Sequence, residues 1–386
     1  MILGTIIIYL LILSVLVIAH EFGHFSVAKF FHVRVDEFGI GFPPQLCELF
    51  RWKGTNFVLN LLPLGGYVNL AGETAPAQED RCSHTKTNTD TADQTLFYHK
   101  PAWQRFLVIL AGPVVNLFLA ALVFVLAYGV WGIPRKVTGQ VYIDYVEAES
   151  PAAIAGISVG PRLYRLSDSS ASSVLVETRE QAMAYFAAHH GQTITLELIG
   201  DCHEGVCTGN IATYTATLRR DENIPVGGGA IGLSFSSYQD YFYPWYQHIP
   251  LSVYYGFRQS FYMTGAMLQG LWTALKQLFT PGKSEVVVMG PVGIVSELDR
   301  QETFRAGMMS IISFAGILSL NLGVINLLPI PAVDGGRLFL IICEKIVGRQ
   351  RVAKIEGLLN YVGFALVILL MLLVTGADIM RLFTGG

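Results

Sequence analysis

Charged residues are scarce in this chain of 386 residues, making up 14% of it, where soluble domains have about 25%. The 26 basic and 29 acidic residues leave a net charge of −3. The basic surface that nucleic-acid binding requires is therefore missing. We expect no nucleic-acid partner.

Cysteine is also rare, and the five cysteines form no zinc-knuckle or dithiol redox pattern. Cys202 and Cys207 flank a short loop, which permits a disulfide if the loop lies outside the cytoplasm. Alternatively, the two cysteines and His203 bind a metal ion. The first apolar run has no positive n-region and no small-residue cleavage site, so a retained membrane span is expected instead of a signal peptide.

Hydrophobic residues, in contrast, make up 52% of the chain, and the mean hydropathy is +0.47. This composition is typical of a membrane protein that also carries a soluble part. Apolar runs long enough to cross a bilayer predict a polytopic α-helical membrane protein with four transmembrane helices. They lie at about residues 2–30, 106–133, 306–328 and 357–380.

The segments between the spans differ in character. Residues 35–70 hold short alternating runs and glycine turns, which predict a membrane-associated β-hairpin, and residues 73–96 form a polar loop. Residues 136–236 are β-rich and of a length that suits one compact inserted domain. Residues 237–303 are aromatic-rich with few charges and are expected to lie amphipathically in the interface. The two membrane halves are then residues 1–135 and 304–386.

Lysine and arginine concentrate between spans one and two and between spans three and four. The positive-inside rule places both segments on the cytoplasmic side and the inserted domain on the far side. With four spans, the end of span one and the residues after span three lie near the same membrane side. A fifth span at 260–279 would separate them, so Tyr238–Phe279 is expected to be interfacial.

The motif His20-Glu21-Phe22-Gly23-His24 ends the first apolar run. In a helix, His20 and His24 lie on one face and can bind one Zn²⁺. Glu21 lies beside them and can accept a proton from a metal-activated water. The same pattern also occurs by chance in water-exposed helices. Here it lies at or inside a membrane, where ionisable groups are costly and usually functional.

A catalytic zinc has three protein ligands and one water. Phe30 occupies the position where a metzincin would have its third histidine, so a carboxylate is the expected third ligand. The candidates are Asp36, Glu37, Asp334 and Glu344. Asp334 is preferred because it follows an Asn-and-double-Pro break, and irregular backbone at membrane depth is tolerated only inside protein or beside a water-filled cavity. Alternatively, Asp334 caps a helix that starts at Gly335.

The chain resembles the site-2 protease family of intramembrane zinc metalloproteases, and most closely its bacterial RseP type, which has periplasmic PDZ domains and cleaves anti-sigma factors. The resemblance rests on the motif at residues 20–24, the later Asn326-x-x-Pro329-x-Pro331-x-x-Asp334-Gly335 motif and the domain between spans two and three. It implies zinc as cofactor, with His20, His24 and Asp334 as ligands and Glu21 as general base.

The resemblance also implies roles for other residues. Asn326 would bind substrate or the oxyanion, and Pro329 and Pro331 would shape the break. Gly66 and Tyr67 lie in a run that is similar to the family's substrate-binding hairpin and loop; a plain structural hairpin is the alternative. Residues 150–160 are similar to the helix and turn of a PDZ domain, but residues 161–164 depart from the usual Asp-x-Ile. The inserted PDZ-like α+β domain therefore either recognises a peptide or acts as a size filter.

Together these features predict a zinc endopeptidase of the bacterial inner membrane, with its active site toward the cytoplasm and the PDZ-like domain in the periplasm. Its expected partners are membrane lipid and single-span membrane proteins, such as anti-sigma factors or remnant signal peptides, after a first cut by a site-1 protease. The alternative is a catalytically silent membrane scaffold or receptor with a structural zinc. A complete HExxH argues against the alternative, because a structural site needs no glutamate there and keeps no open position.

Overall fold

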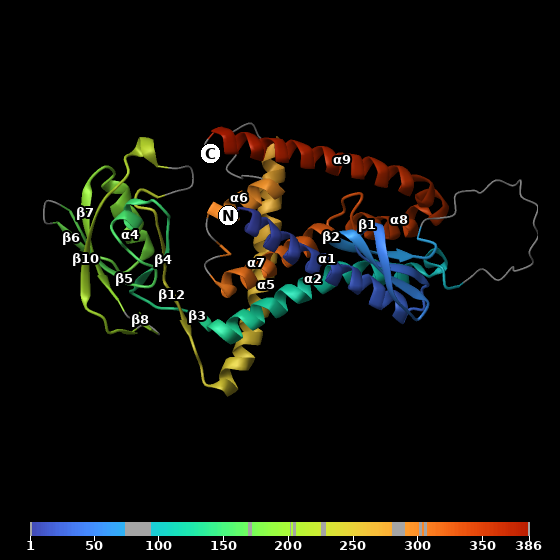
Figure 1. The fold of residues 1–386 in the computed structure, drawn as a ribbon, viewed down its shortest axis with the longest axis horizontal. Coiled ribbons are helices and arrows are strands. Elements are labelled where there is room, and N and C mark those ends of the chain that lie inside the picture. Colours follow the sequence, from blue (N-terminus) through green and yellow to red (C-terminus); the bar gives the residue numbers. More distant parts are fainter. Residues whose placement is uncertain are drawn as a thin grey trace, which may run out of the picture. The chain divides into compact units, whose positions relative to one another are not determined.

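The computed structural model describes residues 2–73, 94–168, 172–200, 202–203, 206–224, 229–279, 290–300, 303–304 and 307–384. Most of the expected polar loop, residues 74–93, lies outside them. The chain forms two compact units, residues 1–125 with 256–380 and residues 126–255 with 381–386. The first unit contains most of the long apolar helices and the second is rich in strands (Figure 1).

Four of the described helices are long and apolar enough to cross a membrane, as the sequence predicts. They are α1 (Ile2–Phe30), α2 (Ala102–Trp131), α7 (Met308–Leu327) and α9 (Arg349–Thr384). Two of them start before the expected position, because their first turns are polar and the prediction counted only the apolar run. A short 3₁₀ turn, η1 (Phe97–His99), precedes α2.

The remaining helices of the first unit are α5 (Trp245–Phe279), α6 (Pro291–Arg300) and α8 (Asp334–Val347), and α5 also extends into the second unit. The region expected to be interfacial begins differently from the prediction. Its first residues form strand β12 (Tyr238–Tyr241), which pairs with β3 (Ile133–Lys136), a segment that the sequence assigned partly to span two. Period-two alternation over four residues is too short a signal to separate such a strand from its aromatic surroundings.

The hairpin consists of β1 (Val35–Trp52) and β2 (Thr55–Leu70), which are longer than the short runs that the sequence predicts. Pro43 and Pro44 do not end β1, because they lie between the paired residues Phe42 and Gln45, where no ladder hydrogen bond requires their missing N–H groups. Residues 37–40 pair with residues 56–59 and also with residues 66–69. The start of β1 is therefore the centre of a small sheet.

The second unit contains a six-stranded sheet in the order β10-β7-β5-β4-β11, with β6 paired to β5. Its helix α4 begins at the capping box of Thr178 and Gln181, and Phe186 of α4 stacks on Phe235 of β11 at 5.6 Å. A disulfide joins Cys202 to Cys207. The elements are β4 (Val141–Val146), α3 (Pro151–Ile154), β5 (Arg162–Ser167), β6 (Ser173–Leu175), α4 (Arg179–Ala188), β7 (Thr193–Ile199), β8 (Cys202–His203), β9 (Val206–Cys207), β10 (Ile211–Thr217), η2 (Asp221–Asn223) and β11 (Leu233–Ser236).

A buried carboxylate fixes the start of α6. Asp378 of α9 is 2% exposed and accepts hydrogen bonds from the backbone N–H groups of Gly290 (2.9 Å) and Gly293 (2.8 Å). Carboxylates at a helix N-terminus satisfy N–H groups that have no partner within the helix. A Cβ on Gly293 would lie 2.7 Å from Asp378 Oδ1, so only glycine permits this contact.

We expect Gly293→Ala to lower the free energy of unfolding by about 1–3 kcal/mol, because the added methyl group displaces the Asp378 carboxylate. Gly265→Ala in α5 is the matched control, since a Cβ there meets no atom within 4 Å. Thermal unfolding of both variants in detergent measures the difference. Equal melting temperatures for the two variants would contradict the close contact.

Candidate metal centre

Helices α1, α2 and α8 all contribute to one hydrophobic core of the first unit. A cluster of polar side chains, His20, His24 and Asp334, is carried by two of these helices. Helix α1 contributes Phe25 and Ala28 to this core, and both are almost fully buried. The same core holds residues from α2 and α8: Val108, Ile109, Leu338 and Ile341. His24, which directly precedes Phe25, and His20, one turn earlier, are also buried, with residue exposures of 8% and 6%.

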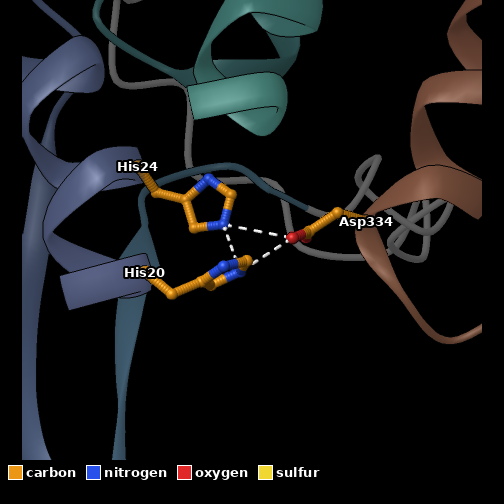
Figure 2. Close-up of side chains that lie close together, drawn as sticks. All are labelled: His20, His24 and Asp334. Atoms are coloured by element: carbon orange, nitrogen blue, oxygen red, sulfur yellow. Dashed lines mark hydrogen bonds and ion pairs between the residues drawn. The ribbon is translucent and has the colours of Figure 1, made fainter. Parts of the chain in front are cut away.

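The structure brings Asp334 to this histidine pair. Its Oδ2 lies 2.9 Å from His20 Nε2 and 3.3 Å from His24 Nε2, and the two Nε2 atoms lie 3.1 Å apart (Figure 2). Asp334 is the first residue of α8, and its side chain does not cap the helix. The alternative interpretation of Asp334 as a helix cap is therefore wrong.

Two glycines after Asp334 permit this placement. A Cβ on Gly335 would lie 2.0 Å from the Leu328 carbonyl oxygen, and one on Gly336 would lie 2.3 Å from that of Ile330. The first turn of α8 therefore packs directly against the backbone of the break that follows α7. Asp334 projects from the point where the two segments meet.

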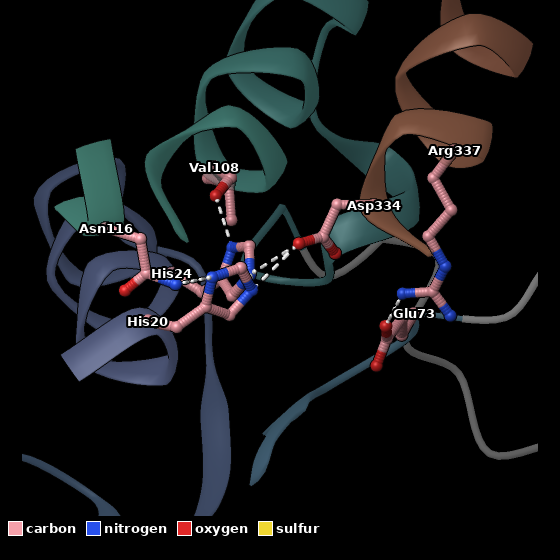
Figure 3. Close-up of polar contacts among 7 residues, drawn as sticks. All are labelled: His20, His24, Glu73, Val108, Asn116, Asp334 and Arg337. Carbon is pink, nitrogen blue, oxygen red and sulfur yellow. Dashed lines mark hydrogen bonds and ion pairs between the residues drawn. The ribbon is translucent and has the colours of Figure 1, made fainter. Parts of the chain in front are cut away.

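Contacts on the far side of each ring indicate which ring nitrogen carries the hydrogen (Figure 3). His24 Nδ1 lies 2.8 Å from the Val108 carbonyl oxygen, which can only accept, so Nδ1 carries the hydrogen and Nε2 keeps its lone pair. His20 Nδ1 lies 3.3 Å from Asn116 Nδ2, while Asn116 Oδ1 is buried without a partner. Turning this amide over lets Oδ1 accept from Nδ1–H, since the two ends of an amide are assigned from such networks.

These side chains fit a zinc ion. Two ligands at 2.0–2.1 Å from a tetrahedral zinc lie about 3.3 Å apart, which is close to the separations of 2.9–3.3 Å between the Nε2 and Oδ2 atoms. Lone pairs of two imidazoles and a carboxylate that point at one another repel unless a cation lies between them. A two-nitrogen, one-oxygen set is also the kind that catalytic zinc uses with one position left open.

Glycines make room for the rings. A Cβ on Gly112 of α2 would lie 2.3 Å from His24 Nε2, and a Cβ on Gly23 of α1 would lie 2.7 Å from the carbonyl oxygen of Ala111. Any larger residue at these positions would force α1 and α2 apart or push the imidazoles out of place. The role of Gly112 depends on a neighbouring helix and therefore leaves no signal in the local sequence.

Ion pairs hold the helix that carries Asp334. Arg105 of α2 and Glu344 of α8 form a paired contact in which Nη1 lies 3.0 Å from Oε1, and their side chains are only 7% and 12% exposed. Arg337, one turn after Asp334, contacts Glu73 at the end of the hairpin (Figure 3). These two contacts join α8 to α2 and to the segment after β2, which limits how far Asp334 can move.

The electrostatic surroundings favour an ionised Asp334. Burial raises the pKa of the Asp334 carboxyl, but protonation of His20 or His24 at Nε2 places a donor against Oδ2 and holds that pKa below its usual value. Glu21 lies within electrostatic range of both histidines and of Asp334. A second carboxylate is therefore available beside the cluster without forming part of it.

The other carboxylates that the sequence offered as ligands have different partners. Asp36 pairs with Arg34 at 3.0 Å, Glu37 accepts from the Tyr67 hydroxyl, and Glu344 pairs with Arg105. Within the described residues, His20, His24 and Asp334 form the group whose spacing suits a metal ion.

The residues expected to bind substrate are not members of the cluster. Asn326 is in the last turn of α7, and Pro329 and Pro331 are in the break between α7 and α8. Gly66 packs on the Gly39 carbonyl and near Ile18 of α1. The Tyr67 ring covers Gly39, where a Cβ would lie 2.3 Å from the ring.

Asn116 is a polar residue inside an apolar run, a position where the sequence favours an interhelical contact. Its side chain does contact another helix, but the partner is His20 itself. The signal that was available is its position three residues after Pro113 in a span, where polar groups need a partner.

Comparisons with known proteins agree with a metal-dependent hydrolase. The sequence model of peptidase family M50 matches residues 8–370. A protein of Clostridium acetobutylicum that is provisionally named a zinc metalloprotease is 30% identical over 375 residues, covering 97% of each chain. The regulator of sigma-W protease RasP of Bacillus subtilis is 26% identical over 456 residues, covering 99% of this chain and all of its own. A PDZ domain of a carboxy-terminal protease from Vibrio cholerae aligns with 23% of this chain at 14% identity and a TM-score of 0.19.

We expect Gly112→Ala to weaken zinc binding by at least about tenfold, because the methyl group occupies the space of the His24 imidazole. Gly129→Ala in the same helix is the control, since a Cβ there meets no atom within 4 Å. Competition with a chelator gives the zinc affinity of each purified variant. Unchanged affinity in Gly112→Ala would show that the imidazoles do not use this space.

We expect Glu344→Ala to destabilise the protein by about 3–5 kcal/mol, because Arg105 is left buried without its partner. Adding Arg105→Met should recover most of the loss. Asp36→Ala breaks the exposed pair with Arg34 and should cost less than about 1 kcal/mol. Denaturation in detergent compares the variants, and a double variant as unstable as the single one would contradict the charge argument.

Proposed function

The chain belongs to peptidase family M50, and we propose that it is an intramembrane zinc endopeptidase that cleaves single-span membrane proteins within their transmembrane segments. Zinc is the cofactor of the family, and the apolar helices make the chain a multi-pass membrane protein. The observation that carries the proposal is the convergence of His20, His24 and Asp334. Two of these three side chains come from α1, which is long and apolar enough to span the bilayer.

We assign His20, His24 and Asp334 as the zinc ligands and Glu21 as the general base. A zinc ion held by these three side chains would supply Lewis-acid chemistry, which polarises a scissile carbonyl and activates a water molecule. Glu21, adjacent to His20 in α1, accepts the proton of the attacking water and passes it to the leaving amine. Val108 and Asn116 orient the two imidazoles by contacting Nδ1 of His24 and Nδ1 of His20, respectively.

A transmembrane substrate must lose its helix before it can react, because its amides are otherwise paired internally. The hairpin offers an edge for the unwound segment, since, within the described part of the chain, residues 66–69 pair with residues 37–40 and with no second strand. An extended peptide can add to such an edge as a further strand. In this arrangement Gly66 and Tyr67 contact the substrate backbone, and Asn326, Pro329 and Pro331 border the reacting carbonyl.

The charge distribution supports a site toward the cytoplasmic side of a bacterial inner membrane, with the β-rich domain in the periplasm. We propose that this domain is PDZ-like and that it excludes substrates with bulky ectodomains until a first protease has removed them. The name of RasP, a regulator of sigma-W protease, supports anti-sigma factors as substrates, and remnant signal peptides fit the same requirements.

We expect Glu21→Gln to keep zinc and to lose cleavage of a single-span model substrate by a factor of at least about 10²–10⁴, because the amide cannot accept the proton. Metal analysis and a gel-based cleavage assay in detergent are run on the same preparation. His24→Ala is the comparison variant and should lose both zinc and cleavage.

Two outcomes would contradict the proposal. Cleavage by Glu21→Gln at the wild-type rate would exclude Glu21 as the base. If the wild type binds zinc but cleaves no single-span substrate, and a chelator changes only its stability, the protein is a scaffold with a structural zinc.

A further inference from the structure

A cavity of about 370 Å³ lies directly beside Asp334. One wall comes from the break and the start of α8, and the other comes from α9. It is lined by Ala332, Val333, Asp334, Arg337, Asn360 and Phe364. Its volume is in the range of small-ligand sites and suits a few residues of extended peptide.

A close helix contact determines which side of α9 faces this cavity. Gly363 packs on Pro331 of the break so tightly that a Cβ would lie 2.3 Å from Pro331 Cβ. Asn360 and Phe364 are four residues apart and share one side of the helix, next to the side on which Gly363 meets Pro331. Glu356, one turn earlier, lies within electrostatic range of Arg337. These contacts fix the position of this side of α9 relative to the segment that carries Asp334.

Asn360 is a polar residue in an otherwise apolar part of α9. From Gly357 to Val374, α9 has no charged residue and Asn360 is its only amide. Among the described residues, the Asn360 side chain has no hydrogen-bond partner, and it lines the cavity. A polar group in a span is costly unless it faces protein or a water-filled cavity, and such residues usually mark functional sites.

We propose that Asn360 is a substrate-binding residue that hydrogen-bonds to the backbone of the unwound substrate beside the metal centre. A carboxamide donates two hydrogen bonds and accepts two, so it can pair with both the N–H and the C=O of one extended residue. A peptide unwound inside a membrane leaves such groups without water, and leaving them unpaired is costly. Phe364, one turn further, offers an apolar wall to the neighbouring substrate side chain. The inference rests on the proposed function.

The test uses the full-length protein and a fluorescent single-span peptide of about 20 apolar residues with a central Asn-Gly pair that weakens its helix. Asn360→Leu keeps the approximate volume but removes the hydrogen bonds, and Asn360→Gln keeps the amide. We expect Asn360→Leu to raise KM about 5–20-fold, which corresponds to one or two lost hydrogen bonds, with kcat changed less than about twofold. Asn360→Gln should recover part of the loss.

Tyr361→Leu is the matched control, because Tyr361 is the neighbouring polar residue of α9 and is 74% exposed. It should leave KM unchanged. Zinc content should be equal in all variants, which separates loss of substrate contact from loss of the metal centre.

Binding is measured separately from turnover in the Glu21→Gln background, from the fluorescence anisotropy of the same peptide. Asn360→Leu should weaken this binding by the same factor as it raises KM. If the wild type cleaves the peptide but Asn360→Leu binds it normally, the inference is wrong and the proposed function stands. If the wild type cleaves nothing while Asn360→Leu still weakens binding, the proposed function fails and the site remains a peptide-binding site.

Discussion

The rest of the structure depends on the convergence of two imidazole nitrogens and one carboxylate oxygen at a single point. His20 and Asp334 are 314 positions apart in the chain, yet their polar atoms lie 2.9 Å apart. Atoms that all carry lone pairs do not approach one another spontaneously in a buried place. The surrounding helices must hold them there, and a cation turns the repulsion between them into attraction.

The helices achieve this by close backbone approach and by buried charge. Gly23 and Gly112 let α1 and α2 come close enough for the rings to fit, and Gly335 folds α8 against the break. The pair of Arg105 with Glu344 then links α8 to α2 with a defined geometry. Buried ion pairs add little net stability, but they specify one arrangement because either partner alone is costly. That property suits a ligand whose position must be fixed.

A protease that acts within a membrane has two opposing requirements. Its metal site must be dry enough for electrostatic interactions to be strong, and it must still admit water and an unwound peptide. The histidines satisfy the first requirement, being 6% and 8% exposed. In the function proposed here, the strand at residues 66–69 and the cavity beside Asp334 would provide polar contacts for a peptide.

The sequence by itself determined the features that depend on neighbouring residues: the four apolar helices and the histidine pair with Glu21 beside it. Hydropathy and helical period act over a few turns, so they can be read without the fold. The sequence left four carboxylates as candidates for the third ligand, and it left a helix cap as the alternative role of Asp334. Only the tertiary structure decided that Asp334 lies beside the histidines while Glu344 pairs with Arg105. The length of the hairpin, strand β12 and the space above Gly112 were likewise decided by contacts between distant segments, which no local pattern encodes.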